Sequence, residues 1–196
     1  MEKTLLITGF DPFGGESINP AWEAVRRLPE TIGNYHLVKL QIPTVFGKAP
    51  ELVLETAAKV RPQVILSVGQ AGGRRAVTPE RVAINLMDAS ICDNAGVRPQ
   101  EQPIAEAGPA AYFATVPVKA MARAIREAGL GGAVSNTAGT FVCNQVLYSV
   151  LHHFAGTETR AGFIHVPYLP QQAKEGVPSM ELDQIVAALT AAIGAL

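Results

Sequence analysis

Short apolar runs alternate with amphipathic stretches along this chain. Residues 4–8 (TLLIT), 64–68 (VILSV) and 162–166 (GFIHV) contain no Lys, Arg, Asp or Glu, and a glycine or proline follows each run. Short runs of this kind predict buried strands, and the alternating segment from Tyr35 to Ile42 predicts a further strand. Two less regular segments, 82–87 and 132–135, are also expected to be strands.

Between these runs, apolar residues recur at helical spacing, which predicts amphipathic helices. The positions are Ala21, Val25 and Leu28; Leu52, Val53, Thr56, Ala57 and Val60; Val118, Met121, Ala122, Ile125 and Ala128; Val146, Leu147, Val150 and Leu151; and Leu182, Ile185, Val186, Leu189 and Ile193. Asn19 is the expected N-cap of the first helix, with Pro20 at its first position, and Ser179 is the expected N-cap of the last. Gly129 marks a helix end, and residues 92–108 read as an exposed loop.

Buried strands separated by helices indicate an α/β sandwich with a largely parallel, twisted sheet. The chain has no internal repeat and no composition shift that would mark a boundary, so residues 1–196 are expected to form a single domain. In such sheets, binding sites lie beyond the carboxyl ends of the strands. The loops that follow Thr8, Val68, Ser135 and Val166 are therefore the places to look for chemistry.

Composition narrows the function classes. Hydrophobic residues make up 48% of the chain, which excludes a disordered protein, and 16 basic against 17 acidic residues leave no electrostatic footprint for nucleic acid or a membrane surface. The N-terminal apolar run is too short for a signal peptide, and no stretch reaches the roughly 18 apolar residues of a membrane span. With only two cysteines, neither a disulfide scaffold nor a zinc site is expected. A soluble, cytoplasmic protein is the resulting expectation.

Cys143 lies where a nucleophile is useful. It follows the small residues of SNTAGTFV, at the junction between the predicted strand 132–135 and a predicted helix. Backbone N–H groups at a helix N-terminus favour thiolate over thiol, and they can also face an oxyanion. The alternative is a buried cysteine that only packs in the core. Cys92 has a carboxylate neighbour in Asp93, which disfavours a thiolate, so we treat Cys92 as incidental.

A cysteine nucleophile needs a base and a group that orients the base. His165 lies near the end of a predicted strand, and because strand ends of one sheet converge, it is the best candidate for the base. The other histidines are His36, in a strand pattern, and His152 and His153, late in the helix that follows Cys143. Glu80, Asp88 and Asp93 are all possible orienting groups. Glu80 is favoured because it begins an apolar stretch, where an unpaired carboxylate is costly.

Two glycine-rich loops follow predicted strands. The first, GFDPFGG, carries Phe10 and Phe13, which either plug the end of the sheet or form an apolar clamp for a flat ligand. The second, GQAGGR, offers backbone N–H groups that suit an anion or an acyl oxygen. Neither loop contains GxGxxG or GxxxxGK[ST], so a nucleotide-phosphate cradle is not indicated.

Taken together, these segments resemble the pyroglutamyl peptidase I (pyrrolidone-carboxylate peptidase) family, particularly its bacterial members. The resemblance covers nearly the whole chain in the family's order and spacing. The matching segments are TGFDPFGG (8–15), Asn19-Pro20, VGQAGGR (68–74), TPERVAIN (78–85), GPAAYFATVPVKAM (108–121), SNTAGTFVCN (135–144) and GFIHVPYLPQQ (162–172).

The resemblance implies a three-layer α/β/α fold and a cysteine peptidase that removes N-terminal pyroglutamate from peptides through a thioester. It implies Cys143 as nucleophile, His165 as base and Glu80 as orienting carboxylate. It further implies a cytosolic protein that needs no cofactor or metal and commonly assembles as a homotetramer. The residues expected to hold the lactam ring are Phe10, Phe13, Asn19, Gln70 and Val142.

One position departs from the family's pattern. Relatives typically carry arginine where this chain has Ser90, and that arginine lies near the nucleophile in the family. Loss of one oxyanion donor costs on the order of 10²-fold in rate. A catalytically weakened pyroglutamyl-peptide-binding relative is therefore an alternative, unless Arg74 or Arg75 compensates. A phosphate-using transferase, suggested by the glycine-rich loops, is a third hypothesis.

Overall fold

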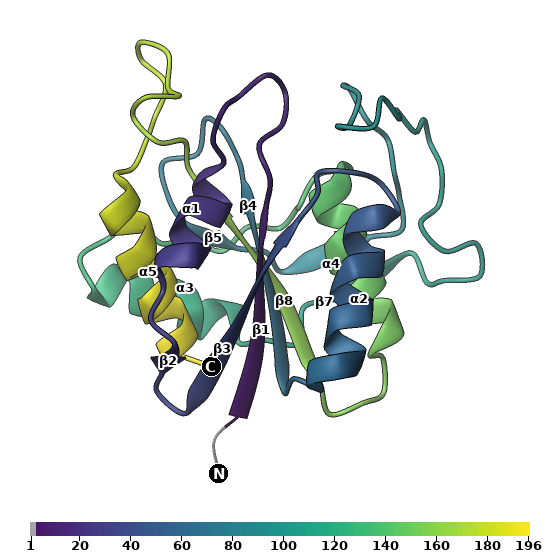
Figure 1. Ribbon diagram of the computed structural model, residues 1–196, viewed down its shortest axis with the longest axis horizontal. Coiled ribbons are helices and arrows are strands. Elements are labelled where there is room, and N and C mark those ends of the chain that lie inside the picture. Colours follow the sequence, from purple (N-terminus) through teal and green to yellow (C-terminus); the bar gives the residue numbers. More distant parts are fainter. Residues whose placement is uncertain (1–2) are drawn as a thin grey trace.

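A six-stranded sheet with helices on both faces forms the centre of the computed structural model, which describes residues 3–196 (Figure 1). The sheet order is β2 (Thr31–Ile32), β3 (Tyr35–Ile42), β1 (Lys3–Phe10), β4 (Val64–Gln70), β8 (Arg160–Val166) and β5 (Thr78–Pro79). Strands β3, β1, β4 and β8 run parallel, and the two-residue strands β2 and β5 join the edges antiparallel. The predicted largely parallel, twisted sheet is confirmed.

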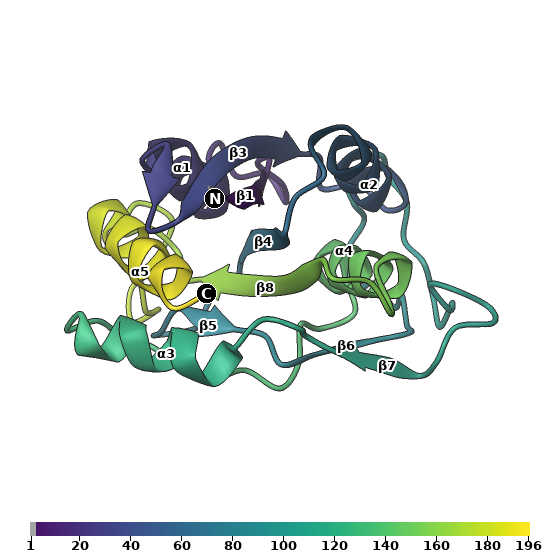
Figure 2. The same ribbon diagram turned by 90° about the horizontal axis from the view of Figure 1, so that it is seen from below.

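The helices form one layer on each face, as Figure 2 shows from below. Helices α1 (Pro20–Arg27), α3 (Val118–Glu127) and α5 (Leu182–Gly194) cover one face, and α2 (Lys48–Val60) and α4 (Val142–His153) cover the other. Each layer has its own apolar core. In β1, Leu5 and Ile7 point into the first core, whereas Leu6 and Phe10 point into the second. A strand buried on both faces reads as a continuous apolar run, which explains why its pattern was predictive.

The first helix begins as the sequence predicts. The Asn19 side-chain oxygen accepts a hydrogen bond of 3.0 Å from the Ala21 amide, and Pro20 occupies the first helical position. The helix crosses β1 closely at Gly9, where a Cβ atom would lie 2.8 Å from the Trp22 Cα. Only a residue without a side chain allows this approach, so Gly9 sets the distance between α1 and the sheet.

The second half of the chain differs from the predicted pattern. Residues 132–135 are not a strand: Gly132 and Ser135 make isolated parallel bridges to Val77 and Glu80. The predicted strand 82–87 is shorter, as β6 (Val82–Ile84), and pairs with β7 (Ala111–Phe113) in a separate two-stranded sheet. Strands of two or three residues carry no readable periodicity, so β2, β5 and β7 were not predicted.

One cap was assigned to the wrong residue. Helix α5 has Glu181, not Ser179, as its N-cap, and the Gln184 side chain accepts a hydrogen bond of 3.3 Å from the Glu181 amide. Ser179 instead pairs with Tyr168 in an isolated bridge. A glutamate followed three residues later by glutamine forms a reciprocal capping box, which competes with a serine nearby.

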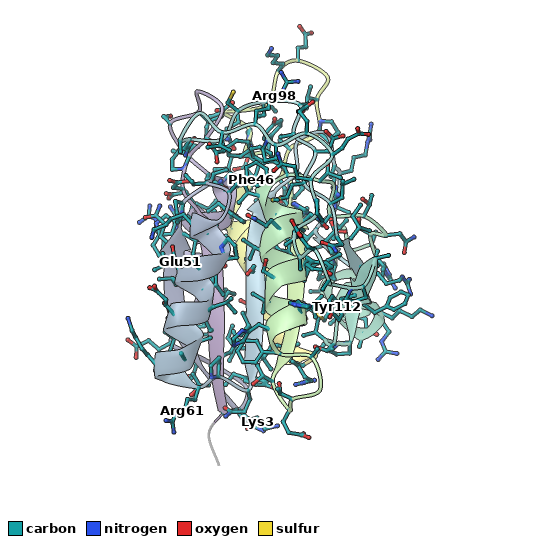
Figure 3. The ribbon with its side chains drawn as sticks, turned by 90° about the vertical axis from the view of Figure 1, so that its right-hand side faces the viewer. Lys3, Phe46, Glu51, Arg61, Arg98 and Tyr112 are labelled. Carbon is teal, nitrogen blue, oxygen red and sulfur yellow. The ribbon has the colours of Figure 1, made fainter. Side chains whose placement is uncertain are left out.

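The long loops gather at the carboxyl ends of the parallel strands, at the top of Figure 1. They include residues 11–19, 71–77, 85–110 and 167–181. Figure 3 shows Phe46 and Arg98 toward this end, at the N-terminal ends of α2 and α4, and Lys3 and Arg61 at the opposite end. The candidate site residues must therefore be sought beneath these loops.

Gly9→Ala is expected to lower the free energy of unfolding by about 1–3 kcal/mol, because its Cβ must displace the backbone of α1. Urea unfolding followed by circular dichroism measures this change. Gly194→Ala, at the end of α5 with no atom near its Cβ position, is the matched control and is expected to leave stability equal or slightly higher. Equal stability of the two variants would contradict the close-approach argument.

Candidate active site

Cys143 is the second residue of α4, and its side chain is half-buried. The N-cap position is Phe141, whose side chain provides no hydrogen bond to the first turn. The backbone N–H groups at the start of α4 therefore have no side-chain acceptor and stay available to an anionic group placed beside the thiol. The predicted junction of a turn and a helix at Cys143 is confirmed.

The thiol lies against the paired ends of β4 and β8. A Cβ atom on Gly69 would stand 2.9 Å from Cys143 Sγ and 2.8 Å from the Phe163 ring. Gly69 is the ladder partner of His165, and Phe163 precedes His165 by two residues on the same face of β8. The imidazole and the thiol therefore occupy the same side of the sheet, and the missing side chain of Gly69 leaves room for the sulfur.

A buried carboxylate orients the imidazole. Glu80 directly follows β5, its side chain has 0% exposure, and its Oε1 lies 2.7 Å from His165 Nδ1. The Glu80 amide also donates to the Phe163 carbonyl at 2.9 Å, which fixes the backbone beside β8. An ionised carboxylate only accepts hydrogen bonds, so Nδ1 carries the proton and Nε2 is left free to act as a base.

Arg74 binds the same carboxylate oxygen. Its Nη1 lies 2.6 Å from Glu80 Oε1 and 2.5 Å from Thr78 Oγ1, and its Nη2 donates to the Thr137 carbonyl at 3.3 Å. The sequence offered Arg74 only as a replacement for a missing oxyanion donor. Its guanidinium is instead engaged by Glu80.

Burial dominates the protonation states of the site. It raises the pKa of Cys143 to about 12, with the negative charge of Glu80 acting in the same direction and Arg74 opposing it. Burial also lowers the pKa of His165, although the hydrogen bond and charge of Glu80 oppose this shift. The backbone N–H at the helix N-terminus lowers the pKa of the thiol, as the sequence led us to expect, but burial outweighs this effect. The resting pair is a neutral thiol and a neutral imidazole.

Glu80 stays ionised despite its burial. Burial by itself would raise the pKa of the carboxyl group, but the interactions with His165, together with the smaller ones from Ser135 and Arg74, outweigh it in sum. The net pKa of Glu80 lies below its usual value. Its Oε2 is buried and has no hydrogen-bond partner among the described residues, whereas Oε1 lies within hydrogen-bond distance of both His165 and Arg74.

Aromatic rings border the start of α4. The Phe13 and Phe141 rings are 6.1 Å apart, and Phe46 meets Phe141 edge-on at 5.2 Å. Phe10 is only 2% exposed and packs 6.2 Å from the Phe163 ring, so it belongs mainly to the core. Of the two predicted clamp residues, Phe13 has the more accessible position. Phe46 and Phe141 were not predicted, because nothing in their local sequence distinguishes them from core residues.

The remaining predicted binding residues have different surroundings. Gln70 ends β4, and its Oε1 accepts a hydrogen bond of 3.0 Å from Gln172 Nε2. Asn19 is 2% exposed and uses both side-chain polar atoms within the fold, to Ala21 and to the Asp11 carbonyl. Val142 has no exposed surface, so only its backbone is open to a ligand role. Direct contact of these residues with a ligand stays a prediction.

The other candidates for the orienting carboxylate lie elsewhere. Asp93 binds the Phe46, Ala95 and Val97 amides and so shapes its own loop, and Asp88 is exposed. Ser90 is exposed as well.

Neither a metal centre nor a membrane span is evident in residues 3–196. These residues contain no group of three or more His, Cys, Asp or Glu side chains placed to hold a metal ion. None of their helices is long and apolar enough to cross a membrane.

A thiol, an imidazole and a buried carboxylate at one sheet edge are the arrangement of a cysteine-type hydrolase. A profile of the family described as pyroglutamyl peptidase matches residues 3–196. The chain therefore belongs to the pyroglutamyl peptidase family, whose members are cysteine-type omega peptidases, and it is an enzyme of that class.

Individual relatives agree over almost the whole length. The chain is 59% identical to a pyrrolidone-carboxylate peptidase of Levilactobacillus brevis, with 98% of this chain and 96% of the relative covered. It is 53% identical to the corresponding protein of Thermococcus onnurineus, with 94% of each covered. The crystal structure of pyroglutamyl peptidase I from Bacillus amyloliquefaciens superposes with a TM-score of 0.96 at 47% identity, covering 99% of this chain and 96% of that one. The predicted family and three-layer fold are confirmed.

Glu80→Gln is expected to lower kcat by roughly 10²- to 10⁴-fold, because the amide keeps the shape but cannot stabilise a charged imidazole. The charge of Glu80 raises the pKa values of both Cys143 and His165, so its removal is expected to move the acid limb of kcat/KM to lower pH. Steady-state kinetics across pH measures both effects. Glu158→Gln, an exposed change, is the control. An unchanged kcat in Glu80→Gln would contradict the orienting role.

Proposed function

We propose that this enzyme hydrolyses the bond after an N-terminal pyroglutamyl residue of peptides, with Cys143 as nucleophile, His165 as base and Glu80 as orienting carboxylate. The observation that carries the proposal is the 2.7 Å contact between the fully buried Glu80 and His165, with the Cys143 thiol on the same side of the sheet. Membership of the pyroglutamyl peptidase family supports the choice of substrate.

The lactam ring requires apolar walls. Pyroglutamate has no free α-amine and no charge, so its ring suits a pocket bounded by aromatic side chains. Phe13 and Phe141, whose rings are 6.1 Å apart, border the start of the helix that carries Cys143. A ring held beside them brings the pyroglutamyl carbonyl close to the thiol. The near-neutral chain, with a formal net charge of -1, is consistent with an uncharged substrate end.

The polar edge of the lactam needs one donor and one acceptor. Gln172 Oε1 accepts from the Leu169 amide at 3.1 Å, which fixes its Nε2 as the group that donates to Gln70 Oε1. Gln70 therefore keeps its own NH2 group for another acceptor. We assign that NH2 group to the lactam carbonyl, which proline lacks, so a prolyl residue is rejected because a polar group stays unpaired.

Catalysis begins from the neutral pair. The thiol proton passes to His165 Nε2 as sulfur attacks the pyroglutamyl carbonyl carbon, and the Cys143 backbone N–H supports the oxyanion. The charged imidazole, stabilised by Glu80, then protonates the leaving amine, and a thioester remains. Water attacks the thioester with His165 as base and releases pyroglutamate and free thiol. Burial raises the pKa of Cys143 to about 12, which disfavours a preformed thiolate. Transfer of the thiol proton to His165 during the attack makes a preformed thiolate unnecessary.

Ser90 makes a weakened, substrate-binding relative the second candidate. The Asp88 amide donates to the Thr140 carbonyl at 3.1 Å, so the segment that carries Ser90 runs beside the turn before Cys143. The Arg74 side chain contacts Glu80, and Arg75 is exposed, so compensation for Ser90 by either arginine stays a prediction. A cytoplasmic location and a homotetramer stay predictions from the family resemblance.

Cys143→Ala is expected to abolish release of a chromogenic amine from a pyroglutamyl amide, because no other thiol lies beside His165. Cys92→Ala, an exposed change, is expected to keep wild-type activity. Iodoacetamide is expected to inactivate the wild type through Cys143, and free pyroglutamate is expected to slow that reaction. Retained activity in Cys143→Ala, or no hydrolysis by the wild type, would refute the proposal.

Ser90→Arg is expected to raise kcat by about tenfold or more if the site lacks an oxyanion donor. The change is made at an exposed position, so the fold is expected to tolerate it. Ser90→Gln, which adds length without charge, is the control. Steady-state kinetics with the same pyroglutamyl amide decides: an unchanged or lower kcat in Ser90→Arg removes the argument for a weakened enzyme.

A further inference from the structure

We propose that Arg74 is a positioning residue of this site, which holds the Glu80 carboxylate in line with His165 and joins it to the segment that leads to Cys143. The role of Arg74 in catalysis rests on the proposed function, whereas its role in holding the Glu80 carboxylate does not. Arg74 touches neither the thiol nor the imidazole by hydrogen bonding, so it acts through Glu80.

The guanidinium connects the segment 78–80, which follows its own loop, to residue Thr137, which is distant in sequence. Its Nη1 contacts Glu80 Oε1 at 2.6 Å and Thr78 Oγ1 at 2.5 Å, both at the edge next to β8. Its Nη2 donates to the carbonyl of Thr137, six residues before Cys143, at 3.3 Å. A planar group with several fixed donors can satisfy acceptors in different directions at once, which a lysine ammonium on a single flexible stem does less well.

Glu80 depends on this contact because it is held through one oxygen. Oε1 accepts from both His165 and Arg74, while Oε2 is buried without a partner among the described residues. If Arg74 is removed, the carboxylate keeps the His165 hydrogen bond at Oε1 and the weaker interaction with Ser135. A buried charge that has lost its only positively charged partner is costly, and the carboxyl group then either rotates or takes up a proton.

The conformation of the loop that carries Arg74 allows its side chain to contact Glu80. It turns immediately after β4, with Gly73 at φ +83° and a hydrogen bond of 3.4 Å from the Arg74 amide to the Ala71 carbonyl. A side chain on Gly72 would collide with the Tyr168 ring, at 2.2 Å. The paired glycines therefore let the loop fold tightly beneath Tyr168 and direct the arginine back toward Glu80. The glycines are evident in the sequence, but the direction that they give to the Arg74 side chain is not.

Arg74 also places a positive charge beside the reacting groups. The charged and titratable groups that face Glu80 are His165, Arg74 and the Cys143 thiol. Arg81, the next residue along from Glu80, is directed away and donates to the Asn136 side chain at 2.8 Å. Loss of a nearby positive charge raises the pKa of every neighbouring acid, so it moves the acid limb of the pH profile upward. Neutralising Glu80 is expected to move the limb the opposite way.

The test compares Arg74→Gln, Arg74→Lys and Arg75→Gln with the wild type in kcat, KM and the pH dependence of kcat/KM. Arg75 is exposed and adjacent, so it controls for a general change of surface charge. Arg74→Gln is expected to lower kcat about tenfold or more, leave KM within about twofold, and raise the acid limb by about one pH unit. Arg74→Lys is expected to lose part of kcat but to keep the acid limb in place.

A second readout needs no peptide. In a Cys92→Ala background, the rate at which iodoacetamide alkylates Cys143 is measured against pH, and Arg74→Gln is expected to shift this profile upward as well. If the wild type fails to hydrolyse pyroglutamyl amides, the proposed function fails while the alkylation profile still decides the role of Arg74. Wild-type kcat and pH profile in Arg74→Gln, or the same shift in Arg75→Gln, would overturn the proposal. If Arg74→Gln does not fold, Arg74→Lys decides: reduced kcat with an unmoved acid limb supports the proposal, and wild-type kcat overturns it.

Discussion

The burial of one carboxylate organises the active end of this enzyme. The Glu80 side chain has no exposed surface, and an ionised group so placed is tolerated only when donors surround it. His165 and Arg74 supply donors, and both donate to the same carboxylate oxygen, Oε1. The short strand β5 and the bridge from Glu80 to Ser135 hold the backbone where these bonds can form. At this edge of the sheet, beyond β8, the short strand and the isolated bridge place the Glu80 carboxylate against the His165 imidazole.

Burial has opposite consequences for the two partners of the proton transfer. It destabilises both charged forms, so it raises the pKa of the Cys143 thiol and lowers the pKa of His165. Both shifts favour a neutral thiol beside a neutral imidazole in the free enzyme. In the proposed mechanism, charge separates only as the attack proceeds, when Glu80 stabilises the imidazolium and the first turn of α4 faces the oxyanion.

The sequence was sufficient where one signal dominated. Apolar runs buried on both faces identified β1, β4 and β8, and the Asn19-Pro20 pair identified the start of α1. Convergence of strand ends, together with the family resemblance, brought Cys143, His165 and Glu80 together. Where several weak signals compete, sequence reasoning failed: residues 132–135 pair at isolated bridges, and a capping box displaced Ser179. The partner of Arg74 was also unpredictable, because a flexible side chain on a glycine loop reaches several acceptors.

A positive charge can serve a cysteine peptidase in two ways: it can lower the pKa values of the reacting groups, or it can stabilise the oxyanion. A guanidinium whose hydrogen bonds are directed away from the thiol acts on the reacting groups through its charge. Arg74 gives its Nη1 to Glu80 and Thr78, and its Nη2 to Thr137, so its field reaches the thiol while its hydrogen bonds do not. The oxyanion is then left to the backbone N–H groups at the start of α4. In the proposed mechanism, the serine at position 90 therefore bears on transition-state stabilisation, whereas burial and the charges of Arg74 and Glu80 determine the protonation equilibrium of the site.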